Sequence, residues 1–198
     1  MATKFHALHT TTLDHSITFC KPDHETQAVS PDGPAISVMT DLRKTKAITI
    51  KPDALLEDCN QHMIRNNVRL LLVTNEQDQV LGIITARDIL GEKPMLHQQK
   101  TGVSRQDIQV RDIMTPTNSL EAMRLEDVER ARVGDIVEDL ISKGRHHALV
   151  VCKEPDGSGE KICGIFSATQ IGKQIGAPIE PADIAKTFAE LEKVIVEH

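Results

Sequence analysis

The chain carries two similar octapeptides, and this internal repeat constrains its fold more than any other feature. Residues 82–89 read Gly-Ile-Ile-Thr-Ala-Arg-Asp-Ile, and residues 164–171 read Gly-Ile-Phe-Ser-Ala-Thr-Gln-Ile. Each is an apolar run that ends at a hydroxyl residue and has a polar residue three places later. A shorter pattern, one apolar residue followed by Met-Thr, precedes each octapeptide at residues 38–40 and 113–115. Matching parts in a fixed order predict two copies of one folding unit.

The composition excludes several classes of protein. With 198 residues, the chain can bury a core as one domain or as two small ones. Its formal net charge of −6 disfavours nonspecific nucleic-acid binding, which needs a basic face. No apolar run approaches the roughly 18 residues of a membrane helix, and the first residues lack the apolar core of a signal peptide. Because the four cysteines are scattered without a CxxC pair, we expect a reduced, cytoplasmic protein without membrane insertion.

Each copy predicts the same order of elements: strand, helix, strand, strand, helix. Apolar residues at helical spacing follow a short strand, and Asn66-Asn67 or Gly144 ends the helix. Two apolar strands follow, and the last helix starts at the hydroxyl residue of the octapeptide. The extra length of the second copy falls in its polar segments, residues 124–132 and 153–160. The predicted strands are residues 47–50, 70–74 and 80–84 in the first copy and residues 119–123, 148–152 and 161–166 in the second.

These elements divide the chain into five segments. We expect an irregular N-terminal arm at residues 1–34, whose four histidines lack the tight spacing of a metal site. The repeats occupy residues 35–97 and 108–177, joined by a linker at residues 98–107. A C-terminal helix is expected at residues 178–198, where one apolar stripe is formed by Ile184, Phe188, Leu191 and Ile195.

The ordered, duplicated pattern resembles two CBS domains in tandem, an arrangement often called a Bateman module. The resemblance covers residues 35 to 177 and rests on the Met-Thr pairs, the apolar strand pairs and the two octapeptides. It implies an α+β fold in which two β-α-β-β-α units pack through their sheets about a pseudo-twofold axis. It also implies two clefts for an adenosyl effector (AMP, ADP, ATP or S-adenosylmethionine), no required cofactor, a homodimer and a regulated partner protein that the sequence does not name.

Asp88 and Thr85 carry the chemistry of the first octapeptide. A carboxylate can accept hydrogen bonds from both hydroxyls of a ribose, and the hydroxyl and free N–H groups at a helix start suit a phosphate or ribose oxygen. Arg87 lies between them and can screen phosphate charge. Thr-x-x-Asp is also a variant of the capping box. These four residues alone favour capping, whereas the resemblance favours ribose binding, and both roles can coexist at Thr85.

The resemblance carries further positions into each cleft. For cleft 1 it implies ligand contacts from Val38, Met39, Thr40, Arg69, Leu70, Thr85, Arg87 and Asp88. Cleft 2 is expected to bind more weakly or not at all, because Gln170 offers one neutral acceptor in place of a carboxylate, while Ser-x-x-Gln fits a standard capping box. The matching positions of cleft 2 are Met114, Thr115, His147, Ala148, Ser167 and Gln170.

Two more features have alternative interpretations. The cationic run at residues 143–147 is either a solvated helix end or a phosphate contact of cleft 2, and phosphate would then bind better at low pH as the histidines charge. Cys152 and Cys163 are expected to face each other as reduced thiols. We find no metal-ligating or nucleophile–base set and expect no catalytic residue. The leading hypothesis is a regulatory adenosyl-ligand sensor; the alternative is a structural dimerisation or protein-interaction module with degenerate, non-binding clefts.

Overall fold

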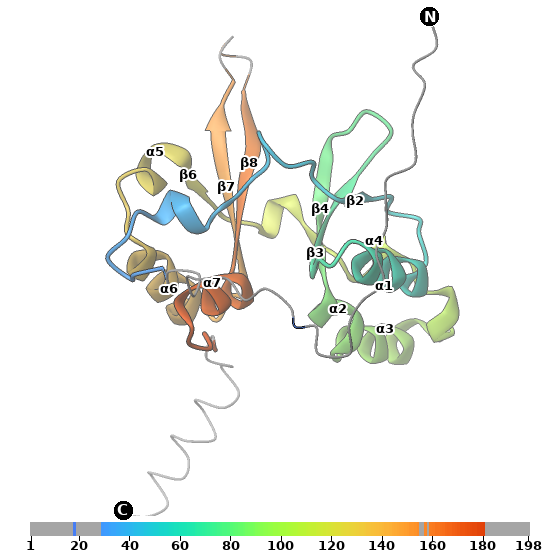
Figure 1. The fold of residues 1–198 in the computed structure, drawn as a ribbon. Coiled ribbons are helices and arrows are strands. Elements are labelled where there is room, and N and C mark those ends of the chain that lie inside the picture. The colour runs from blue at the N-terminus through green and yellow to red at the C-terminus, as the bar shows by residue number, and fades with distance from the viewer. Residues whose placement is uncertain (1–17, 19–28, 155–156, 158, 181–198) are drawn as a thin grey trace, which may run out of the picture.

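The computed structural model describes residues 18, 29–154, 157 and 159–180. The predicted C-terminal stripe, the N-terminal histidines and Cys20 lie outside these residues. Figure 1 shows two lobes, one for each repeat. The first lobe contains β2 (Thr49–Ile50), α1 (Leu56–Arg65), β3 (Leu70–Thr74), β4 (Val80–Thr85), α2 (Ala86–Leu90) and α3 (Lys93–Thr101). The second contains β6 (Ala122–Arg124), α5 (Leu125–Val128), α6 (Val133–Ser142), β7 (His147–Lys153), β8 (Glu160–Ser167) and α7 (Ala168–Ile175).

The first long helix of each repeat forms and ends in the same way. Every third or fourth residue of α1 and α6 is buried, so each helix presents one apolar face to its core. Each ends at a residue with positive φ, 51° at Asn67 and 61° at Gly144. The next N–H then bonds back into the helix, from Val68 to the Met63 carbonyl at 3.0 Å and from Arg145 to the Leu140 carbonyl at 2.8 Å. The predicted helix ends are confirmed.

The strands of the two repeats pair alike. In each repeat the first strand is parallel to the second, and the second is antiparallel to the third. Both hairpins shift register at the same place, after Val73 in β3 and after Val150 in β7. A shared bulge at matching positions shows that the duplication extends to backbone detail.

The segments that open the two repeats are exchanged between the lobes. The segment that opens the first repeat contains η1 (Ala35–Val38) and β1 (Thr40–Asp41), and β1 pairs with β8 of the second. The matching α4 (Val110–Ile113) and β5 (Thr115–Pro116) lie on the first lobe, where β5 pairs with β4. Figure 1 shows the blue η1 beside α6 and α7, and α4 beside α1. The sheets therefore have the orders β1-β8-β7-β6 and β2-β3-β4-β5.

Side chains from both sheets share one apolar cluster. Leu70 and Leu72 of β3 and Leu149 of β7 are its buried members, and Ile83 and Ile165 pack against them. Each sheet also has an outer core, which lies between it and the helices of its lobe. The mixed α+β fold with two repeats packed through their sheets is confirmed.

Some boundaries differ from the sequence-based prediction. Strand β6 begins at Ala122, three residues later than expected, because η3 (Thr117–Ser119) occupies the start of the predicted segment. The segment predicted as a linker holds the last turn of α3 and η2 (Arg105–Asp107). None of the helices in the described part of the chain has the length and apolar character needed to cross a membrane.

Candidate functional site

The candidate site begins where β4 meets α2, at a capping box. The Thr85 N–H donates to Asp88 Oδ2 at 2.7 Å, and its hydroxyl donates to the same oxygen at 2.6 Å. The Asp88 N–H donates to Thr85 Oγ1 at 3.3 Å. Asp88 is only 9% exposed, so its carboxylate is held in one orientation. The capping interpretation of these residues is confirmed.

A residue that the sequence analysis missed, Lys93, completes this junction. Its Nζ lies 2.5 Å from Asp88 Oδ1 and also donates to the Ile113 carbonyl at 3.2 Å and to Thr115 Oγ1 at 3.3 Å. The lysine reaches back because the helix is interrupted at Gly91 and restarts as α3, with Pro94 in its first turn. The pair Gly91 and Pro94 was the sequence signal of this break.

The structure corrects the predicted grouping of the opening segments. Thr40, placed in cleft 1 by sequence, lies on the second sheet, and its hydroxyl donates to Gln170 Oε1 at 3.3 Å. Met39 packs against Gly164, and Val38 is buried in the outer core of the second lobe. Thr115 instead lies beside Asp88 through Lys93. With its neighbour Met114, it therefore lies on the Asp88 side, because β1 and β5 cross to the opposite sheets.

The sequence matched Arg69 and Leu70 of cleft 1 with His147 and Ala148 of cleft 2, and the structure shifts this matching by one position. Leu70 pairs with Thr85, and His147 pairs with Ser167, so His147 corresponds to Leu70 rather than to Arg69. The backbone agrees, since the Arg69 carbonyl accepts from Ala86 at 2.9 Å and the His146 carbonyl accepts from Ala168 at 3.0 Å. Ala148 is buried in the outer core.

His147 and Arg69 lie between the β4–α2 junction and the matching β8–α7 junction of the second repeat. Arg69 Nη1 donates to Thr169 Oγ1 at 3.4 Å, across the boundary between the repeats. Burial, followed by the charges of His146 and Arg69, lowers the pKa of His147 to about 4, although Asp88 acts in the opposite direction. His147 is therefore neutral at pH 7, and it does not gain the charge expected of it at mildly acidic pH.

The second junction does not form the predicted capping box. Within the described residues, Ser167 makes no capping hydrogen bond with its side chain, and Gln170 accepts from Thr40 instead. The amide turns toward the opening segment because that segment lies on the same sheet. At both junctions the polar residue three places after the hydroxyl, Asp88 or Gln170, is thus linked to the opening segment of the other repeat.

The cationic run after α6 is paired with acidic side chains. Lys143 Nζ lies 2.5 Å from Asp139 Oδ1, and Arg145 Nη2 lies 2.7 Å from Glu121 Oε2. These pairs support the interpretation as a solvated helix end.

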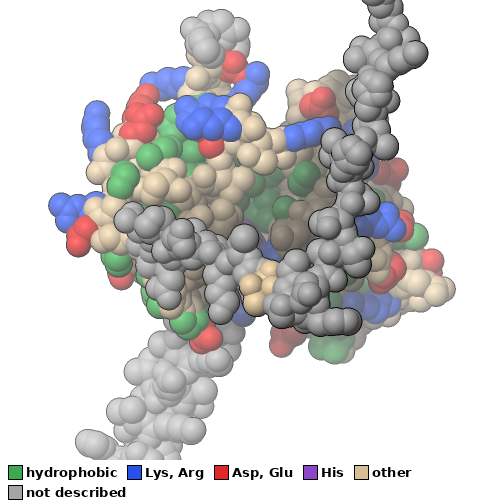
Figure 2. All heavy atoms as spheres, in the orientation of Figure 1, with side chains coloured by type: hydrophobic (Ala, Val, Ile, Leu, Met, Phe, Trp, Pro, Cys, Tyr) green, Lys and Arg blue, Asp and Glu red, His purple; other side chains and the backbone are tan. Residues whose placement is uncertain are grey.

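Among the described residues, no cluster of three His, Cys, Asp or Glu side chains is arranged to hold a metal ion. Figure 2 shows acidic and basic side chains interspersed over the visible face.

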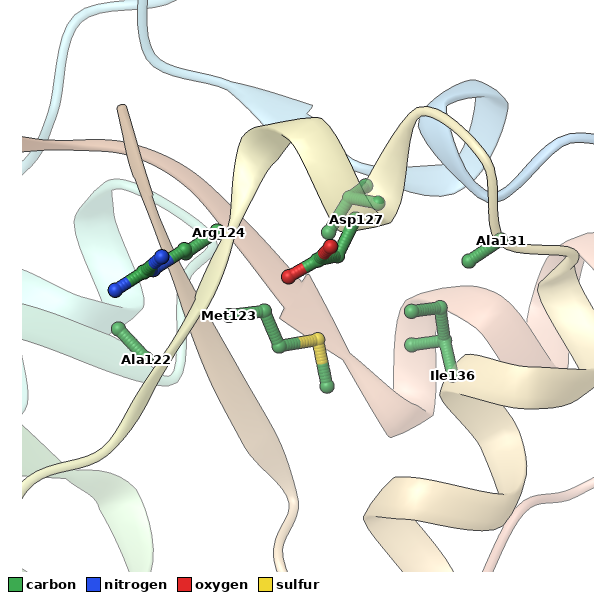
Figure 3. Close-up of a pocket in the computed structure, with 7 residues that line it drawn as sticks. Ala122, Met123, Arg124, Asp127, Ala131 and Ile136 are labelled. Atoms are coloured by element: carbon green, nitrogen blue, oxygen red, sulfur yellow. The ribbon is translucent and has the colours of Figure 1, made fainter. Parts of the chain in front are cut away.

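Two pockets lie beside β6, and neither is lined by Asp88. The larger, of about 390 Å³, is shown in Figure 3, where Met123 and Ile136 face the space and Arg124 extends away from Ile136. The smaller, of about 230 Å³, includes Arg145 and Leu149 in its wall.

Cys152 and Cys163 are free thiols in contact, as expected, and burial together with the Cys152 hydrogen bond raises the pKa of Cys163 to about 12.

Comparisons with known proteins agree with this architecture. Residues 37–94 match the model of the CBS domain family. A 17.7 kDa protein of Acidianus ambivalens is 24% identical over 151 residues, which cover 72% of this chain and 80% of that protein.

Two solved structures show the same fold. A conserved protein from Pyrococcus horikoshii has a TM-score of 0.53 and 23% identity, over 78% of this chain and all of that one (100%). The CBS domain of a bacterial CNNM/CorC family Mg²⁺ transporter in complex with ATP has a TM-score of 0.50 and 19% identity, over 75% of this chain and 91% of that one. Residues 37–94 thus match the CBS domain family, and the chain as a whole has the fold of a tandem CBS pair.

Proposed function

We propose that this protein is a regulatory sensor that binds an adenosyl compound, of the class AMP, ADP, ATP or S-adenosylmethionine, in cleft 1. The observation that carries the proposal is the Asp88 carboxylate, which is buried, fixed at a helix start and next to the opening segment of the second repeat. A fixed carboxylate suits the paired hydroxyls of a ribose. Ligand bound here would touch both repeats, and a change in their packing would be passed to a partner protein.

The surroundings of Asp88 support an adenosyl ligand. Leu70 is buried beneath the junction, and Arg69 supplies a cation on its rim. Apolar walls with a few fixed polar groups are typical of cofactor pockets. The transporter CBS domain that shares this fold was solved with ATP, which supports the ligand class.

Titration calorimetry on nucleotide-free protein with AMP, ATP and S-adenosylmethionine tests the proposal. We expect saturable binding near one site per chain, and Asp88→Asn should weaken it about tenfold or more, because hydrogen bonds to a charged group are lost. Asp135→Asn is the matched control, since Asp135 also accepts a helix-capping bond, from the Arg132 N–H at 2.8 Å. Wild-type affinity in the Asp88 variant would show that the ribose contact is wrongly placed.

The alternative function, a dimerisation or protein-interaction module, also has a specific observation in its favour. Leu90 and Leu96 are large apolar side chains that are 71% and 53% exposed on α2 and α3 of the first repeat. Helices α2 and α3 are in contact, and large exposed apolar side chains on neighbouring elements are a feature of protein interfaces. If the wild type is a homodimer in sedimentation and Leu90→Glu with Leu96→Glu gives monomers, this face is the interface. A dimer that survives both changes would place the interface elsewhere.

A further inference from the structure

Lys93 joins two parts of the candidate site that are distant in sequence. One ammonium group contacts Asp88 Oδ1, the Ile113 carbonyl and Thr115 Oγ1. The motif carboxylate is thereby tied to the segment that opens the second repeat. The side chain of Lys93 is 45% exposed and that of Asp88 is 11% exposed, so the lysine covers a buried acid from the solvent side.

A ribose at this site would have to compete with Lys93. Asp88 Oδ2 already accepts two hydrogen bonds from Thr85, at 2.7 and 2.6 Å. The remaining oxygen, Oδ1, is the one that Lys93 contacts at 2.5 Å. Since a charged ammonium group is well hydrated, a half-exposed lysine can leave for water at small cost.

The second repeat lacks both members of this ion pair. With Ser167 matched to Thr85, Gln170 stands in place of Asp88 and Ile175 in place of Lys93. Helix α7 runs without a break to Ile175, and Gln170 contacts the opening segment directly through Thr40. The lysine is thus present where the motif residue is an acid and absent where it is a neutral amide.

We propose that Lys93 is a displaceable lock on cleft 1, which occupies the carboxylate until ribose hydroxyls replace it and releases the opening segment of the second repeat when it leaves. This inference rests on the proposed function. Ligand binding is then an exchange of partners at Asp88 Oδ1. The same exchange removes the Lys93 contacts to Ile113 and Thr115, so occupancy of the cleft alters the hold of α3 on β5.

Calorimetry with adenosine and AMP on the full chain tests the competition. Lys93→Met keeps the apolar stem and removes the charge, and it should tighten adenosine binding about fivefold, since the competing ion pair is lost. Lys100→Met, at the other end of α3, is the control and should leave affinity unchanged. Adenosine affinity that is equal or weaker in Lys93→Met overturns the lock alone. If the wild type binds neither adenosine nor any of AMP, ADP, ATP and S-adenosylmethionine, the proposed function fails, and the lock fails with it.

Hydrogen exchange supplies a readout that needs no ligand. In Lys93→Met the amides of Met114 and Thr115 should exchange several-fold faster than in the wild type, because their segment loses its tie to α3. Lys93→Arg, which retains a charge and donors, should restore much of the protection. Equal exchange rates in all three proteins would show that Lys93 does not hold the opening segment.

Discussion

The two strand–helix junctions have the same backbone but different side-chain chemistry. Each begins with the same hydrogen bond, from Ala86 to Arg69 at 2.9 Å and from Ala168 to His146 at 3.0 Å. In the first repeat a buried carboxylate takes part in the helix cap and pairs with a lysine. In the second repeat a neutral amide accepts a hydrogen bond from a threonine hydroxyl. The comparison shows that strand pairing preserves the fold while the side chains at the two junctions differ in charge.

The glycines before the junctions differ in what surrounds them. A methyl group on Gly82 would strike the Thr115 carbonyl and approach the Pro116 Cα at 3.0 Å, both of them backbone. A methyl group on Gly164 would strike the side chain of Met39. Backbone in a paired strand cannot move aside without loss of register, whereas a methionine can change rotamer.

The largest expected effect follows from this difference. Gly82→Ala should lower the free energy of unfolding by about 3 kcal/mol or more, and Gly164→Ala by about 1 kcal/mol. Urea unfolding followed by far-ultraviolet circular dichroism measures both, because the chain has no Trp or Tyr to report by fluorescence. Equal losses would mean that the opening segments are held with equal rigidity.

His147 and its counterpart Leu70 give the next prediction. The folded pKa of His147, about 4, lies below the ordinary value of about 6.5. Between these values the unfolded chain binds more protons than the folded chain, so the free energy of unfolding rises with pH. The stabilisation is complete above about pH 6.5 and is lost as the pH falls toward 4.

His147→Leu copies the first repeat into the second and should remove this dependence. Between pH 7 and 4.5 the variant should lose about 2 kcal/mol less stability than the wild type. Urea titrations at the two pH values measure the difference, and all other acidic and histidine groups are common to both proteins. Parallel losses in the two proteins would place His147 in a more hydrated environment than the structure gives it.

Local patterns predicted the parts of the fold that local forces determine. The apolar run Leu70-Leu71-Leu72-Val73-Thr74 became β3 without change, and the stop at Gly144 was correct. The exchange of opening segments could not be predicted in this way, because Thr40 pairs with Ile165, more than a hundred residues away. Lys93 was missed for a related reason, since only a helix break brings it back to Asp88.

The smallest expected effect concerns the links between each motif and the opposite opening segment. A double-mutant cycle of Asp88→Asn and Lys93→Met should show a coupling energy of about 0.5–1 kcal/mol, because the lysine is 45% exposed and screened by water. A cycle of Gln170→Ala and Thr40→Val should show about 0.3 kcal/mol, since that hydrogen bond is neutral, long at 3.3 Å and exposed.

Salt separates the two links further. At about 1 M salt the Debye length falls to roughly 3 Å, so the Asp88–Lys93 coupling should shrink while the Gln170–Thr40 coupling stays constant. Urea unfolding of the seven proteins, the wild type and three variants for each cycle, at low and high salt measures both. If the two couplings are equal and neither responds to salt, the charged junction is held no differently from the neutral one, and the contrast between the repeats would have to arise from packing around the motifs.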